Sequence, residues 1–369
     1  MTIYGINVNA SLQLGGFMAS KKGLTLALAA LFPTLSAATI VSAIATYRAI
    51  FPRCERPDYA LVPGEYLYSR IAERLPRREF TFKPHSNTLK GYFYPAMQER
   101  GTVVLRHGIH AGADDYLPLT EGLVRLGYNV FTYDATGTYE SEGESTVGMC
   151  QAIIDLEATI KYLRCQDEIK SAPLYLLGHS WGAYAVASSL CCVEGISGVA
   201  AISGMNNGVN MISDKAREYV KLEKLVEFPD AIFRMYQKLL FGKYVNMCAT
   251  DGINRADVPT LIAHGVDDRV VRFDTQSIVS EANSITAKNT SYYLGKGLNG
   301  GHDTVWHSPD AVAYQMEIES ELSLIKMKSG GTLTNEQKAA LYSKIDHHKY
   351  SAPNEDLLHR IDTTFTSAR

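Results

Sequence analysis

Short runs of apolar and β-branched residues recur along the middle of the chain and alternate with longer stretches of helical periodicity. The runs that predict strands are residues 102–106, 129–133, 174–177, 199–203, 259–263 and 291–294. Segments whose apolar residues repeat at helical spacing lie among them, at residues 116–126, 150–163, 183–191 and 309–325. Because strands and helices alternate, the pattern predicts a mostly parallel central sheet with helices on both faces.

The pattern differs at the start of this region and near its end. Residues 78–83 and 91–94 predict two antiparallel strands joined by a turn at Pro84–Asn87. About 55 residues separate the strand at 199–203 from the next, which is far more than a usual loop. Apolar residues there recur at helical spacing, so residues 204–257 predict a helical insertion lying over the sheet as a cap.

The two ends of the chain carry further helical signals. Residues 23–47 contain no charged side chain and are long enough to span a bilayer as a helix. They could also be a signal peptide, since Ala43-Ile44-Ala45 resembles a cleavage site, or an apolar helix packed on the body or on a partner subunit. The long lead-in favours a membrane anchor, with a secreted or cytoplasmic protein as the alternatives. After Lys326, Thr334–Gln337 fits a capping box, and another short helix is expected near residues 354–364.

These patterns predict three parts of the chain. Residues 1–56 form an N-terminal segment, residues 57–327 form the main domain with its cap, and residues 328–369 form a C-terminal helical extension. The formal net charge of −3, from 36 basic and 39 acidic side chains, gives no field that would favour nucleic acid. The six cysteines form no CxxC pair, so neither a zinc site nor a disulfide framework is indicated.

The strongest chemical signal is Gly178-His179-Ser180-Trp181-Gly182. It directly follows an apolar strand and directly precedes an alanine-rich helix. A sharp strand-to-helix turn needs glycines, because the backbone passes close to its neighbours, and it exposes the serine hydroxyl at the edge of the sheet. This context predicts that Ser180 is a nucleophile rather than an idle serine in a structural turn.

A serine hydroxyl needs a base to remove its proton and a carboxylate to orient that base. Asp267 and Asp268 follow the strand at 259–263, and His302 follows the strand at 291–294. All three lie just past the carboxyl end of a strand, where sites of α/β sheets assemble. His302 is the expected base. His307 is the alternative, although a solvated surface position is the expected role for it.

Acyl transfer also needs backbone N–H groups that stabilise the developing oxyanion. One is expected from Trp181, directly after the nucleophile. The other is expected from Ile109, in the loop His107–Gly112 after the strand at 102–106. His107 and His110 could instead be metal ligands, but no acidic or cysteine partner completes a set, so no metal is expected.

Together these motifs resemble the α/β-hydrolase superfamily, in particular its branch of lysophospholipases, monoacylglycerol lipases and proline iminopeptidase-like enzymes. The resemblance covers residues 78–325 and rests on HGI at His107–Ile109, GHSWG at Gly178–Gly182, HGVDDRVV at His264–Val271 and GGH at Gly300–His302. It implies the α/β-hydrolase fold with a helical cap, and it selects Asp268 over Asp267 as the acid. The run Asp134–Ser141 departs from the pattern of many relatives, which weakens any transfer of a particular relative's substrate.

The sequence therefore predicts a serine hydrolase that cleaves small-molecule or lipid carboxylic esters through an acyl-enzyme, without a metal or an organic cofactor. An amide- or peptide-cleaving hydrolase and a thioesterase use the same apparatus and are the alternatives. A membrane-tethered binding module on a retired hydrolase fold is the non-enzymatic alternative. Within the cap, Phe228, Ile232, Tyr236 and Leu240 are expected to line the acyl channel.

Overall fold

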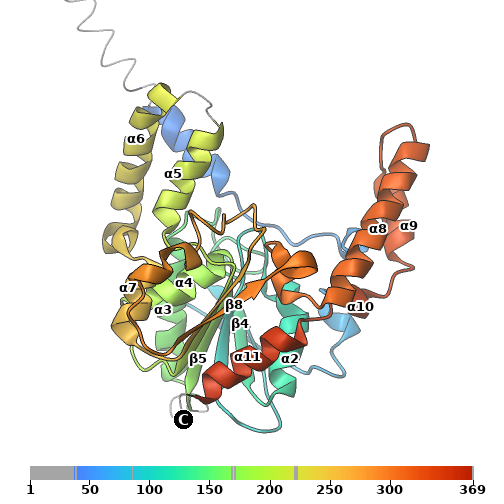
Figure 1. Cartoon of the computed structure of the whole chain (residues 1–369), viewed down its shortest axis with the longest axis horizontal. Helices are drawn as coiled ribbons and strands as arrows, with labels where there is room; N and C mark the ends of the chain where they lie inside the picture. The colour runs from blue at the N-terminus through green and yellow to red at the C-terminus, as the bar shows by residue number, and fades with distance from the viewer. Residues whose placement is uncertain are drawn as a thin grey trace, which may run out of the picture.

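The computed structural model describes residue 37, residues 40–84, 86–167, 169, 172–219 and 223–367, and among these the side chains outside 216–229. Eight strands form one sheet in the order β1-β2-β4-β3-β5-β6-β7-β8 (Figure 1). β1 and β2 pair antiparallel, β2 is antiparallel to β4, and the remaining neighbours are parallel. The strands are β1 (Arg78–Phe82), β2 (Leu89–Tyr94), β3 (Thr102–Arg106), β4 (Asn129–Tyr133), β5 (Leu174–His179), β6 (Gly198–Ile202), β7 (Thr260–Gly265) and β8 (Thr290–Gly295). The predicted hairpin followed by a parallel sheet is confirmed.

Two hydrophobic layers cover the two faces of the sheet. The inner strands are buried throughout, and alternate residues point to opposite layers, as Val103 and Val104 of β3 do. Helices α3 (Gln151–Arg164), α4 (Trp181–Ser189) and α7 (Ala249–Ala256) pack on one face. Helices α2 (Leu117–Arg125) and α11 (Glu355–Thr366) pack on the other. This arrangement confirms the predicted α/β fold class.

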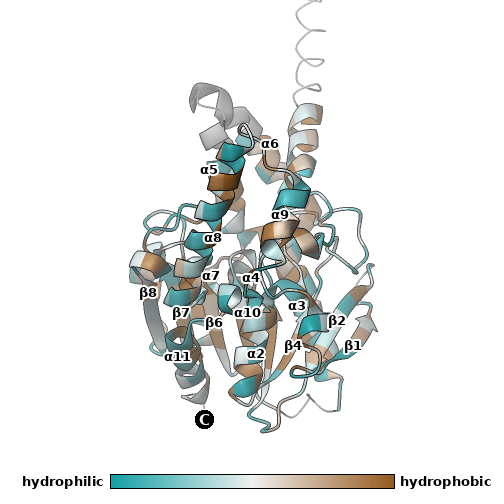
Figure 2. Ribbon diagram, turned by 90° about the vertical axis from the view of Figure 1, so that its right-hand side faces the viewer, coloured by the Kyte–Doolittle hydropathy of each residue, from teal (hydrophilic) through white to brown (hydrophobic). Residues whose placement is uncertain are grey.

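The predicted insertion forms helices α5 (Gly208–Tyr219) and α6 (Glu223–Phe241), the short turn η4 (Gly242–Asn246) and α7. α5 and α6 lie side by side and rise above the carboxyl edge of the sheet (Figure 1). α5 is amphipathic, with hydrophilic and hydrophobic bands alternating along it (Figure 2). Because α5, α6 and α7 make up most of this insertion, the cap is helical, as the periodicity of its sequence predicts.

The end of the apolar N-terminal run is helical and packs against the cap. Residues 40–50 are helical, with Ala43 and Tyr47 buried in the same hydrophobic cluster as Phe233 of α6. The Tyr47 ring meets the Phe233 and Tyr236 rings edge-on, at centroid distances of 5.9 and 5.3 Å. This helix therefore belongs to the folded body, and a domain boundary after it would remove part of the core.

The rest of that run, residues 23–39, lies outside the described residues apart from residue 37. Across the part of the chain that is described, no helix combines the length and hydropathy that crossing a bilayer requires.

The C-terminal extension occupies two different places. Its first helix, α9 (Asn335–Tyr342), projects from the body together with α8 (Pro309–Lys328), the last helix of the predicted main domain, as an arm with its own small apolar cluster (Figure 1). The capping box predicted at Thr334 and Gln337 begins α9. After α10 (His347–Ser351), α11 returns to the sheet, where Phe365 stacks on Tyr175 with ring centroids 4.5 Å apart. The last helix is thus part of the main core rather than an appendage.

Candidate active site

Ser180 lies on a sharp turn between β5 and α4. Its backbone has φ 56° and ψ −117°, a conformation that is strained for a residue other than glycine. A Cβ at Gly178 would lie 2.3 Å from the backbone of Gly182, and a Cβ at Gly182 would lie 2.0 Å from the carbonyl oxygen of Arg106. The two flanking glycines are therefore required by close backbone contacts, as the sequence motif predicts.

The sheet topology brings the predicted acid and base to this turn. His302 follows β8, and Asp268 follows the neighbouring strand β7. His302 Nε2 lies 2.9 Å from Ser180 Oγ, and His302 Nδ1 lies 2.7 Å from Asp268 Oδ2. With a proton on Nδ1 donated to Asp268, Nε2 is free to accept the serine proton. Ser180, His302 and Asp268 therefore form one hydrogen-bonded chain.

Asp268 is held in a site that favours its ionised form. Its side chain has no solvent exposure, and its Oδ1 accepts hydrogen bonds from the backbone N–H groups of Val270 and Val271, at 2.8 and 2.9 Å. Burial alone raises the pKa of this carboxyl, but hydrogen bonds from His264 and His302 outweigh it and hold the pKa below its ordinary value. The carboxylate therefore stays charged and can stabilise a protonated His302.

His307, the alternative base, occupies a different environment from the one that its sequence context suggested. It is 4% exposed rather than solvated, and its ring packs against Trp306 with centroids 3.8 Å apart. Burial lowers its pKa to about 4, so the ring is neutral near pH 7. The histidine that contacts Ser180 is His302.

The loop after β3 runs beside Ser180, because β3 and β5 are neighbours in the sheet. A Cβ at Gly108 would lie 3.5 Å from the Cβ of Ser180, so the next residue, Ile109, begins close to Ser180. Trp181 follows Ser180 at the start of α4, and its indole Nε1 donates to the carbonyl of Met149 at 2.8 Å. The oxyanion roles of Ile109 and Trp181 stay predictions.

His107 joins two loops of the site. Its Nε2 accepts a hydrogen bond from the backbone N–H of Ala135 at 3.1 Å, so its Nδ1 carries the proton and donates to the carbonyl of Gly108 at 2.7 Å. Burial, together with the charge of Arg106, lowers its pKa well below the ordinary value. Both ring nitrogens therefore have hydrogen-bonding partners within the protein, and the ring connects the loop after β3 to the loop after β4.

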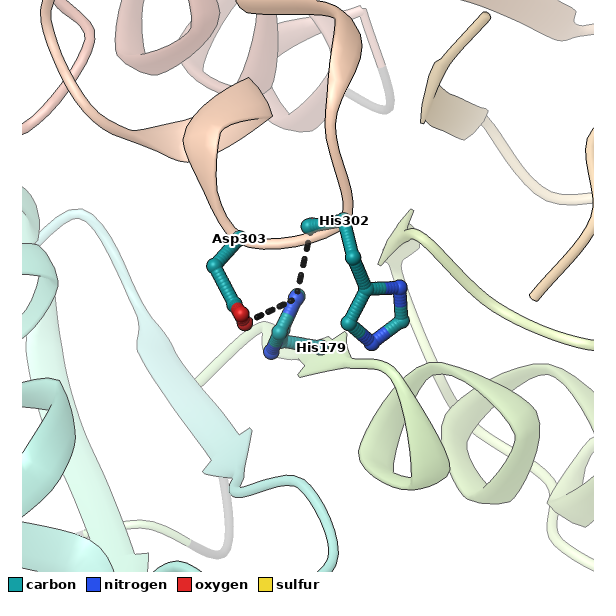
Figure 3. Close-up of side chains that lie close together, drawn as sticks. All are labelled: His179, His302 and Asp303. Carbon is teal, nitrogen blue, oxygen red and sulfur yellow. Dashed lines mark hydrogen bonds and ion pairs between the residues drawn. The ribbon is translucent and has the colours of Figure 1, made fainter. Parts of the chain in front are cut away.

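A second set of hydrogen bonds, absent from the sequence prediction, joins the loop after β3 to the loop of His302. The hydroxyl of Tyr116 accepts from the N–H of Gly108 at 3.0 Å and donates to His179 Nδ1 at 2.8 Å. His179 Nε2 donates to the carbonyl oxygen of His302 at 3.2 Å (Figure 3). The hydroxyl of Ser203 donates to the same oxygen at 2.8 Å. Burial, then the neighbouring His302, lower the pKa of His179 to about 4, so it is neutral as this pattern requires.

His179, His302 and Asp303 lie close enough together for their ligand atoms to surround one ion (Figure 3). Their nitrogen atoms already have hydrogen-bonding partners, and His302 Nε2 lies against Ser180. Glu65, Glu121 and His348 form a similar cluster, in which Arg74 contacts Glu65 and Glu121 at 2.6 and 2.7 Å. Both clusters are therefore accounted for by internal hydrogen bonds and ion pairs.

The Tyr116 bridge leads to a testable prediction. Tyr116→Phe removes a buried hydroxyl that satisfies both Gly108 and His179, which should cost about 1–3 kcal/mol of stability and loosen both loops of the site. We expect kcat for the predicted ester hydrolysis to fall by at least about tenfold, the equivalent of roughly 1.4 kcal/mol. The control is Tyr128→Phe, which removes a hydrogen bond to Asp362 away from the site. If Tyr116→Phe and Tyr128→Phe both lost stability and lowered kcat equally, Tyr116 would have no positioning role.

The cap residues expected to line an acyl channel occupy different environments. Ile232 is 5% exposed and lies in the main hydrophobic cluster. Tyr236 packs against Tyr47, and its hydroxyl accepts a hydrogen bond from Arg48 at 3.2 Å. Leu240 is 41% exposed, and the side chain of Phe228 lies outside those described. The acyl-channel role of these residues stays a prediction.

Known proteins resemble this chain in sequence and in fold. Residues 97–237 match the family model described as serine aminopeptidase, S33. A curated relative, the lysophosphatidylserine lipase ABHD12 of Danio rerio, is 25% identical over 207 residues, which cover 54% of this chain and 52% of the relative. The match thus spans about half the length of that protein. Among solved structures, the Pyrococcus furiosus esterase Pf2001 is 19% identical with a TM-score of 0.50, over 75% of this chain and 98% of the esterase.

Proposed function

We propose that this chain is a serine hydrolase of the α/β-hydrolase superfamily that cleaves carboxylic esters through an acyl-enzyme, as its similarity to known hydrolases supports. The observation that carries the proposal is the continuous hydrogen-bonded chain from Ser180 through His302 to the ionised Asp268. In this arrangement Ser180 can pass its proton to His302, and Asp268 can stabilise the protonated ring of His302.

The chemistry proceeds in two halves. Ser180 Oγ attacks the ester carbonyl carbon while His302 Nε2 takes its proton, and the N–H groups of Ile109 and Trp181 stabilise the oxyanion. Collapse of the intermediate expels the alcohol, which receives the proton from His302, and leaves an acyl group on Ser180. Water, activated by His302, then attacks the acyl group and releases the acid. Asp268 keeps the imidazole oriented and stabilises its protonated form throughout.

Esters are favoured over amides as the substrate class by two of the similar proteins, which are named as a lipase and an esterase. The matched family model bears the name of an aminopeptidase, so cleavage of an amide bond is the alternative reaction. Lipid esters, including lysophospholipids, are the proposed physiological class. A panel of p-nitrophenyl esters, aminoacyl p-nitroanilides and acyl thioesters tests the choice. Fastest turnover of an anilide would replace the proposal with a peptidase.

We also propose that the apolar residues before position 40 attach the protein to a membrane, which suits a lipid substrate. Deleting residues 1–39 removes most of this run and retains the helix that holds Ala43 and Tyr47 in the core. The shortened protein should appear in the soluble fraction with its kcat intact, whereas the full chain should sediment with membranes. The measurement is fractionation followed by an assay on a soluble ester.

A longer deletion serves as the control for that boundary. Removing residues 1–50 also removes the fully buried Tyr47, and loss of a large buried aromatic side chain costs about 3–5 kcal/mol. This variant should unfold at a lower temperature than the protein that lacks residues 1–39. A full-length chain that stays soluble without detergent would overturn the anchor.

A further inference from the structure

An arginine is buried next to the turn that carries Ser180. Arg106 is the last residue of β3, and its side chain is fully buried. It lies two residues after Val104, so it points into the same hydrophobic layer as α4. A guanidinium group stays protonated in a protein, so this apolar layer contains a buried positive charge.

The guanidinium of Arg106 lacks most of the partners that a buried charge normally has. Its Nη1 donates a hydrogen bond to the carbonyl oxygen of His107 at 2.7 Å. Its Nε and Nη2 are buried and have no hydrogen-bonding partner among the described residues, so no carboxylate there bonds to either nitrogen. Burying a charge and leaving buried donors unpaired both lower the stability of a fold. Arg106 therefore occupies a position that stability alone does not favour.

Two aromatic rings face this charge. The Cζ atom of Arg106 lies 4.9 Å from the centroid of the Trp181 ring and 5.6 Å from that of the Tyr133 ring. The face of an aromatic ring attracts a cation, and the attraction is stronger where water is excluded. Trp181 also donates a hydrogen bond from its indole Nε1 to the carbonyl of Met149 at 2.8 Å. These contacts fix the side chain of the residue that directly follows Ser180.

The same guanidinium also fixes the loop after β3. Its hydrogen bond to the carbonyl of His107 holds the start of the loop that contains Ile109. Burial, then the charge of Arg106, lower the pKa of His107, so its ring stays neutral and Nε2 accepts from the N–H of Ala135. Arg106 therefore contacts both segments from which oxyanion donors are predicted.

We propose that Arg106 is a positioning residue that fixes the N–H groups of Ile109 and Trp181 in the geometry that binds the oxyanion. The inference rests on the proposed ester hydrolysis and adds a residue to its machinery. Arg106 acts through these two segments and touches no substrate, because its side chain is fully buried. Oxyanion donors stabilise the transition state only if they are already aimed at the oxygen atom when its charge develops.

The variant Arg106→Met separates this role from a structural one, because methionine is apolar and removes the charge. Loss of an unpaired buried cation should leave the thermal midpoint at the value of the parent protein or raise it. We expect kcat on a soluble ester to fall at least about tenfold while KM changes less than about twofold, as for an interaction made only in the transition state. The affinity for a trifluoromethyl ketone, which forms an oxyanion on Ser180, should fall by the same factor as kcat/KM.

The matched control is Arg100→Met. The guanidinium of Arg100 also lies 4.9 Å from a ring centroid, that of Tyr128, and its Nη1 also donates to a backbone carbonyl, that of Leu126 at 2.8 Å. Arg100 differs in that it pairs with Asp362 at 2.8 Å. Its replacement should therefore lower the thermal midpoint and leave kcat unchanged.

The outcomes distinguish this inference from the proposed reaction. A folded Arg106→Met variant with the kcat of the parent protein would overturn the inference and leave ester hydrolysis standing, as would a loss of kcat that Arg100→Met reproduces. If Arg106→Met does not fold, Arg106→Gln takes its place, since glutamine removes the charge but keeps an N–H donor for the carbonyl of His107. An unchanged kcat in that variant would overturn the inference in the same way. If the parent protein hydrolysed no ester and a fluorophosphonate did not label Ser180, both proposals would fall.

Discussion

Replacing Ser180 with alanine should abolish ester hydrolysis while leaving the fold intact. The substitution removes the proposed nucleophile, and loss of the serine from a catalytic triad lowers kcat by a factor on the order of 10⁶. The Ser180 side chain sits on a turn and packs little apolar surface, so the thermal midpoint should stay close to that of the parent protein. Covalent labelling by a fluorophosphonate should disappear together with activity.

Ser188→Ala is the matched control for this variant. Ser188 lies on α4, the helix that begins after the nucleophile, and its buried hydroxyl has no hydrogen-bonding partner. Its removal should leave kcat and labelling unchanged. If Ser180→Ala kept more than a small residue of activity, the nucleophile would have to be another side chain.

Asp268→Asn should lower kcat by a factor of about 10⁴, the effect known for replacing a triad carboxylate by its amide. Asparagine cannot carry the charge that stabilises a protonated His302, and its NH₂ group can turn towards Nδ1 and select the wrong tautomer. The loss should appear in kcat on a soluble ester, with KM changed much less.

The neighbouring residue provides the control. Asp267 has the same side chain one position earlier, and its backbone N–H donates to the carbonyl of Gly300 at 2.8 Å. Asp267→Asn should therefore reduce kcat only slightly. A larger loss from Asp267→Asn than from Asp268→Asn would reassign the acid.

Much of the fold follows from patterns that are local in sequence. The runs at residues 102–106 and 129–133 form strands at those positions. A strand that is buried on both faces needs a continuous run of apolar residues, whichever strands are its neighbours. The glycines of the motif around Ser180 are likewise dictated locally, since a Cβ at Gly178 or Gly182 would collide with backbone. For the same reason the motif alone places Ser180 between a strand and a helix.

Contacts between distant segments were decided by the tertiary structure. The apolar composition of the N-terminal run suits either a bilayer or a protein core. The packing of Tyr47 against Phe233 and Tyr236 places the end of this run in the folded body. Similarly, the sequence predicts a helix at α11 but not where this helix packs. The stacking of Phe365 on Tyr175 places α11 against the sheet. Periodicity specifies that a face is apolar, and the partner that covers it depends on the whole chain.

The candidate site divides in the same way. Residue types and chain order predicted Ser180 as the nucleophile and His302 as the base, with His307 as the alternative base, and limited the acid to two neighbouring aspartates, because acyl transfer requires a nucleophile, a base and a carboxylate. Tyr116 and His179, which are joined by a hydrogen bond, belong to elements far apart in sequence. No local pattern marks such residues, since their function arises from distances that exist only once the strands have aligned their carboxyl ends at one edge of the sheet.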